Sequence, residues 1–95
     1  MWIAEDVPAY LTDRTLDRPT TDEGWGVTAT RRIARTDTED EARGEVARSL
    51  ESIATFNHVM VRGDQALYES AAEAFRLGAA SVRLHNRVYQ IREES

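Results

Sequence analysis

The C-terminal segment 80–93 most constrains the fold. A single turn at its centre would place its apolar residues on one sheet face and mainly polar residues on the other. If His85 and Asn86 form a two-residue turn, for which Asn is well suited, the flanking residues pair in register. One sheet face then carries Ala80, Val82, Leu84, Tyr89 and Ile91, and the other carries Ser81, Arg83, Val88, Gln90 and Arg92. Because a slip of one residue would exchange the faces, this separation specifies the register, and we expect a β-hairpin.

The same segment also fits a helix. Helical spacing relates Ala80, Leu84, Val88 and Ile91, and no glycine or proline interrupts them. Two observations favour the hairpin: strand-forming residues are frequent in the segment, and Asn86 is poor inside a helix. We therefore expect the hairpin and keep the helix as the alternative, because the two structures imply different functions.

Residues 39–55 are predicted to form a helix. Thr38 and Glu41 match the capping box, in which each side chain satisfies a backbone N–H of the other residue. Apolar residues then recur at helical spacing, at Ala42, Val46, Leu50 and Ile53. Acidic residues in the first turn also suit the helix dipole.

A second helix is predicted from Asp64, as its cap, to about Leu77. Gly78 lies where a glycine commonly ends a helix. Between the two helices, residues 56–62 are ambiguous. Their β-branched residues favour a short strand over 58–62, and the alternative is that the first helix continues to Arg62.

Before the helices, residues 25–35 alternate in a way that predicts a strand with one buried face. Residues 1–24 show no such pattern. We expect an irregular N-terminal segment in which Trp2 begins an edge strand or Pro8 opens one helical turn.

These elements predict an α+β fold in roughly the order β-α-β-α-β-β. Two helices would pack on one face of a small, mostly antiparallel sheet. A chain of 95 residues suits a single domain, 1–95, with its α+β core in residues 25–93.

Composition limits the classes of function. The chain has no cysteine, which excludes disulfides, thiol catalysis and thiolate zinc sites. We find no secretory signal and no apolar run near the roughly 20 residues of a membrane helix, so we expect a soluble cytoplasmic protein that does not bind membranes. The net charge of −5 disfavours non-specific binding to nucleic acid.

Residues with catalytic or ligand-binding chemistry are few. His58 and His85 are the only histidines, and neither has a partner at metal-ligand spacing. We find no glycine-rich phosphate loop and no nucleophile motif. We therefore expect no catalytic residue, no metal and no small-molecule cofactor, and we predict that the protein is not an enzyme.

Aromatic and arginine residues are the best candidates for binding. Tryptophan and tyrosine are frequent in interface hot spots, and an arginine guanidinium can clamp a carboxylate or phosphate with two hydrogen bonds. If the 25–35 strand lies near the hairpin, several members of one arginine set would share an exposed sheet face. The set consists of Arg31, Arg32, Arg35, Arg83, Arg87 and Arg92. The predicted protein-binding residues are Trp25, Arg31, Arg32, Arg83, Tyr89 and Arg92.

The function we expect is that of a small non-enzymatic protein-binding module, a regulator or inhibitor that docks through a sheet face, a sheet edge or a homodimer interface. Its small size and acidic character would also suit an accessory protein of a phage or mobile element. The partner would be another protein or a second copy of the chain.

The alternative is a nucleic-acid-binding regulator that uses residues 64–92. If segment 80–92 is helical, residues 70–91 resemble a helix-turn-helix on Ala74, Gly78 and Leu84. This resemblance implies a recognition helix that presents Arg83, His85, Asn86 and Arg87. Arg87, however, occupies a position that is normally apolar in that family. If the segment is a hairpin, a helix followed by an arginine-bearing hairpin resembles the end of a winged helix, a fold that needs a third helix.

Overall fold

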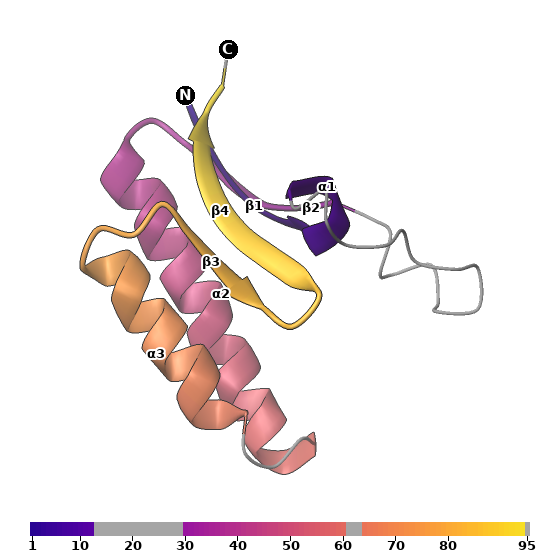
Figure 1. Cartoon of the computed structure of the whole chain (residues 1–95). Coiled ribbons are helices and arrows are strands. Elements are labelled where there is room, and N and C mark those ends of the chain that lie inside the picture. Colours follow the sequence, from indigo (N-terminus) through magenta and orange to yellow (C-terminus); the bar gives the residue numbers. More distant parts are fainter. Residues whose placement is uncertain (13–29, 61–63, 95) are drawn as a thin grey trace.

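Two long helices lie against one face of a four-stranded sheet in the computed structural model (Figure 1). The structure describes residues 1–12, 30–60 and 64–94. Within these ranges the elements are β1 (Trp2–Pro8), α1 (Ala9–Thr12), β2 (Arg31–Thr36), α2 (Glu39–Met60), α3 (Gln65–Arg76), β3 (Ser81–Leu84) and β4 (Arg87–Glu93). The predicted α+β class is confirmed.

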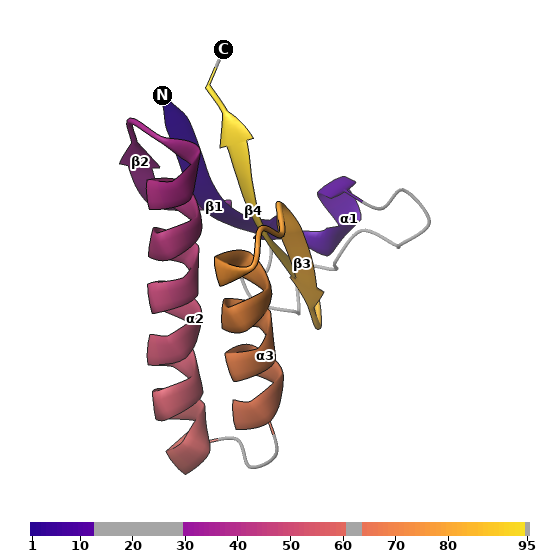
Figure 2. The same cartoon turned by 90° about the vertical axis from the view of Figure 1, so that its left-hand side faces the viewer.

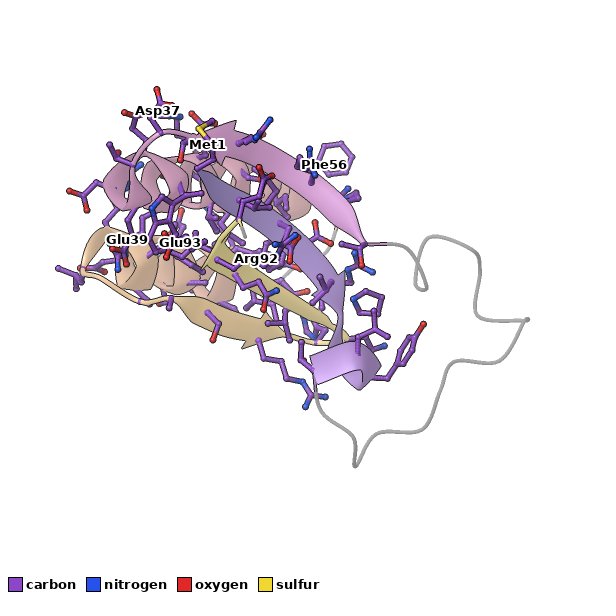
Figure 3. All side chains as sticks on the ribbon, turned by 90° about the horizontal axis from the view of Figure 1, so that it is seen from above. Met1, Asp37, Glu39, Phe56, Arg92 and Glu93 are labelled. Atoms are coloured by element: carbon purple, nitrogen blue, oxygen red, sulfur yellow. The ribbon has the colours of Figure 1, made fainter. Side chains whose placement is uncertain are left out.

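The strands are arranged in the order β2-β1-β4-β3, and every neighbouring pair is antiparallel. Figure 3 shows them side by side in this order. The N- and C-terminal strands are therefore the two central ones, and the ends of the chain lie close together (Figure 1). The Glu94 N–H donates a hydrogen bond to the Met1 carbonyl oxygen at 2.9 Å.

The position of β1 corrects the expectation of an irregular N-terminal segment. Residues 2–8 form a central strand rather than an edge strand, and every residue from Ile3 to Pro8 is buried. A strand buried on both faces does not alternate between polar and apolar residues, so the period-two pattern that reveals exposed strands is absent. Pro8 ends the strand, and α1 supplies the expected helical turn. Residues 13–24 lie outside the described part.

The C-terminal hairpin is confirmed in the predicted register. Val82 pairs with Tyr89, and Leu84 pairs with Arg87. His85 takes the left-handed backbone conformation, with a φ of 56°. The helical alternative for residues 80–92 is therefore wrong, and with it the recognition helix that would have presented the arginines.

Helices α2 and α3 run antiparallel and form a layer on one side of the sheet (Figure 2). Thr38 caps α2, since its Oγ1 accepts the Glu41 N–H at 3.2 Å. The centre of the core joins both layers, with Leu50 from α2, Phe75 from α3 and Ile91 from β4. Burying this apolar surface is the main force that holds the helices on the sheet.

Residues 58–60, where the strand predicted over 58–62 would begin, belong instead to α2, which continues to Met60. Strand propensity is a weak guide over so short a segment, and continuing a formed helix adds one backbone hydrogen bond per residue. The strand predicted at 25–35 is observed as Arg31–Thr36. Residues 25–29 and 61–63 lie outside the described part.

Short helix α1 lies on the opposite side of the sheet from α2 and α3 (Figure 2). Its Ala9 packs with Val7 and Val88 in a small separate apolar cluster. The Ala9 N–H also donates to the Asn86 carbonyl oxygen at 2.8 Å. These contacts cover one end of this side.

Candidate protein-binding face

Strand register assigns each strand residue to one of two faces. Ala4, Leu84 and Tyr89 pack into the core beneath α2 and α3, so their neighbours along each strand point away from the helices. We call that side the open face, because α2 and α3 do not cover it. Its residues are Ile3, Glu5 and Val7 of β1, Arg32 and Arg35 of β2, Ser81 and Arg83 of β3, and Val88, Gln90 and Arg92 of β4. Ile3, Glu5, Val7 and Val88 at its centre are nonetheless buried, and its exposed residues are Arg32, Arg35, Ser81, Arg83 and Arg92.

Arginines outnumber carboxylates on the open face. Glu5 is the only acidic side chain that the described strands direct to it, and Glu94, just after β4, pairs with Arg35. Arg92 lies over the middle strands of the sheet (Figure 3) and donates from Nε to Glu5 at 3.1 Å. Gln90 donates to the same Glu5 oxygen, Oε2, at 2.8 Å. Among the described residues, this face therefore carries more arginines than carboxylates, in a chain whose net charge is −5.

Arg32 contributes most directly to this excess. It lies opposite Glu5 in the register, and it is exposed. No ion pair or hydrogen bond joins the Arg32 guanidinium to another group within the described ranges, whereas Arg35 and Arg92 each hold a carboxylate. A guanidinium in this position can bind an incoming carboxylate without first giving up another one.

Two predicted members of the arginine set lie on the other face. The Asp6 side chain is fully buried there, and it accepts hydrogen bonds from Arg31 of β2 and Arg87 of β4. Arg31 donates from Nε and Nη2 at 2.9 and 2.8 Å, and this hydrogen bond and the Asp6 charge raise the pKa of Arg31. Arg31 and Arg87 are therefore not among the arginines of the set that share the open face.

Tyr89 is buried rather than available for binding. The residue is 4% exposed and belongs to the core beneath the helices. Burial, assisted by the nearby negative charge of Asp6, raises the pKa of Tyr89 to about 12. Tyr89 therefore offers almost no surface to a partner, and its role as a contact residue stays a prediction. Trp25 lies outside the described residues.

The tip of the hairpin contacts the start of α3. The His85 ring is 6.5 Å from the Tyr68 ring, and its Nε2 lies 3.4 Å from Oδ2 of Asp64. Asp64 precedes α3 without the predicted side-chain cap. Arg83, on the open face, donates from Nε to the His85 carbonyl oxygen at 3.1 Å.

The predicted nucleic-acid set is consequently divided. Arg83 is on the open face, whereas Arg87 is on the helix side, where it contacts Asp6. His85 and Asn86 are exposed at the tip between them. The structure does not bring the four side chains together on one surface.

Sequence reasoning missed Glu5 and Asp6, which organise the arginines on the two faces. The available signal was a pair of acids within an otherwise apolar N-terminal stretch. Their arginine partners lie 25 to 87 residues away in sequence, so no local pattern joins them.

A groove of about 380 Å³ lies between α2 and α3, and its lining is mainly acidic, in contrast to the arginines of the open face. Its lining residues are Glu51, Thr55, Glu69, Ala72, Glu73 and Arg76. Arg76 pairs with Glu51, which leaves Glu69 and Glu73 as the excess charge of the groove. None of these residues belongs to the sheet, so the acidic and basic surfaces are separate.

Among the described residues, no group of three or more His, Cys, Asp or Glu side chains is arranged to hold a metal ion. Within residues 1–12, 30–60 and 64–94, no helix combines the length and apolar character that crossing a bilayer requires. No family model, curated protein or solved structure matches the chain.

Proposed function

We propose that the chain is a non-enzymatic protein-binding module and that its open face docks an acidic surface of a protein partner. The observation that carries this proposal is the excess of arginine on that face, and above all the exposed Arg32 without a charged partner in the described part of the chain. Opposite charges across an interface speed association and select the partner.

The chemistry of the open face suits carboxylates. Arg35 and Arg92 each already bind one glutamate side chain within the molecule. Both remain about half exposed, at 50% and 49% of the side-chain surface, so water and a ligand reach the same guanidinium groups. An arginine can bind a carboxylate with two parallel hydrogen bonds. This geometry makes the contact specific for carboxylates, in addition to the attraction between opposite charges.

Aromatic positions favour a protein over a nucleic acid. Sheets that bind single strands stack the bases on exposed aromatic side chains. The aromatic residues of the described strands, Trp2 and Tyr89, both pack against the core on the helix side. The open face of these strands offers arginine without a stacking platform. By occupying the surface of its partner, a module of this kind would act as a regulator or inhibitor.

The test compares two positions on one molecule. A photo-crosslinking amino acid replaces Ser81, which is exposed on the open face, or Ser52, which is exposed on α2. We expect cross-linking to an acidic protein from position 81 and not from position 52. The product should decrease as salt increases, and it should disappear in the double variant Arg32→Glu, Arg83→Glu. Arg48→Glu, which changes an exposed arginine on α2, should leave it unchanged.

Three results would contradict the proposal. Equal cross-linking from both positions would show that the open face has no special role. Mobility shifts of duplex or single-stranded nucleic acid that depend on Arg32 and Arg83 would favour the nucleic-acid alternative. Cross-links from position 81 to the acidic groove between α2 and α3 of a second copy would instead identify self-association.

A further inference from the structure

Strand β2 forms one edge of the sheet. In the part of the chain that the structure describes, β2 pairs with β1 alone, along Arg31–Thr36. An edge strand has backbone N–H and C=O groups that can pair with another extended chain. The other edge strand, β3, spans only the four residues Ser81–Leu84 and is a shorter template.

Arginine lines both faces of β2. Arg32 and Arg35 lie on the open face, while Arg31 lies on the helix side with 64% of its side chain exposed. The residues between them, Ile33 and Ala34, pack against the core. A chain that paired with β2 would therefore meet guanidinium groups above and below its backbone. Those of Arg31 and Arg35 already hold Asp6 and Glu94, and that of Arg32 has no charged partner within the described ranges.

This arrangement disfavours a second copy of the same strand. Antiparallel pairing with full overlap would place Arg32 of each copy opposite Arg35 of the other. A one-residue shift in one direction would place Arg31 opposite Arg35, whereas the shift in the other direction would avoid arginine pairs but would leave Arg31 without an opposite residue. Like charges directly opposite one another destabilise a strand pair, whereas opposite charges stabilise it.

We infer that an extended, acidic segment of a protein partner adds to β2 as a further strand. Main-chain hydrogen bonds along Arg31–Thr36 supply affinity, and alternate side chains supply selection. Carboxylates on one face of the segment meet Arg32 and Arg35, and a carboxylate on its other face meets Arg31. The inference rests on the proposed function, since it specifies how the acidic partner docks.

The probe is a short peptide of alternating glutamate and valine, which presents carboxylates on one face when extended. Its controls have lysine in place of glutamate, or N-methyl groups on alternate backbone nitrogens. Binding is followed by NMR chemical shifts and by hydrogen exchange of the β2 amides. We expect the glutamate peptide alone to bind and to slow exchange of amides in β2. We expect Arg32→Glu to weaken it about tenfold, and Arg48→Glu to have no effect.

The two failures have different signatures. If the glutamate peptide binds and shifts the Arg83 and Arg92 signals without protecting β2 amides, or if the N-methylated peptide binds as tightly, strand addition is wrong and face docking stands. If neither this peptide nor an acidic partner binds, both proposals fail, and the arginines of β2 serve to keep the edge unpaired.

Discussion

Arg87 donates from Nε to Oδ1 of Asp6 at 2.8 Å, a contact that joins the last strand of the sheet to the first. The two residues are 81 positions apart in sequence, yet β4 and β1 are neighbours in the sheet. The Asp6 side chain is fully buried. An ionised carboxylate without access to water is costly unless hydrogen-bonded cations surround it.

Asp6→Asn should destabilise the protein by about 3 kcal/mol, because it leaves the Arg31 and Arg87 charges without their shared partner. Urea unfolding measures the free energy. As a matched control, Asp40→Asn changes a carboxylate whose side chain is 96% exposed and should cost less than about 1 kcal/mol. Equal losses would show that burial of Asp6 contributes nothing special.

The two arginines that hold Asp6 should differ in their contribution. The side chain of Arg87 is 19% exposed and that of Arg31 is 64% exposed. Water screens the more exposed pair, so we expect Arg31→Met to cost less than about 1 kcal/mol and Arg87→Met about 2 kcal/mol. Unfolding curves of the two variants provide the comparison, and a larger loss for Arg31→Met would contradict it.

The C-terminal half of the fold could be predicted because its signals are local. The capping contact of Thr38 with Glu41 spans three residues, and the hairpin register follows from alternation about His85 and Asn86. Strand β1 could not be predicted in the same way. Its burial depends on neighbours from β2 and β4, and its acids are neutralised by arginines that only the completed sheet brings close.

The faces on which the candidate arginines lie could be predicted in part, for a similar reason. Arg32, Arg83 and Arg92 do share one face. Arg31 does not, because neighbouring residues of a strand point to opposite faces. The β1–β2 register shift beside Glu5, which leaves Ile33 as an extra residue in β2, puts Arg32 rather than Arg31 on the face of Arg35. One inserted residue reverses the facing of every side chain beyond it, and nothing in the local pattern indicated the bulge.

The turn residue His85 offers a test of the hairpin. Its φ of 56° lies in the left-handed region, which asparagine tolerates and β-branched residues strongly avoid. We expect His85→Val to cost about 1–2 kcal/mol and His85→Asn to change stability by less than about 1 kcal/mol. Thermal and urea unfolding measure both. Equal stability of the two variants would argue against a left-handed residue at this turn.

Tyr89 should make the protein sensitive to alkaline pH. An unfolded tyrosine ionises near pH 10, whereas the pKa of the buried Tyr89 is about 12. Between these values the unfolded state releases a proton that the folded state keeps. The contribution of Tyr89 to the free energy of unfolding is therefore fully present below about pH 10 and is lost as the pH rises through about 12. We expect Tyr89→Phe to flatten the decline in unfolding free energy across this range. Tyrosine absorbance should show a last ionisation near pH 12 that Tyr89→Phe removes, and complete ionisation by about pH 11 in the folded protein would contradict the burial of this hydroxyl.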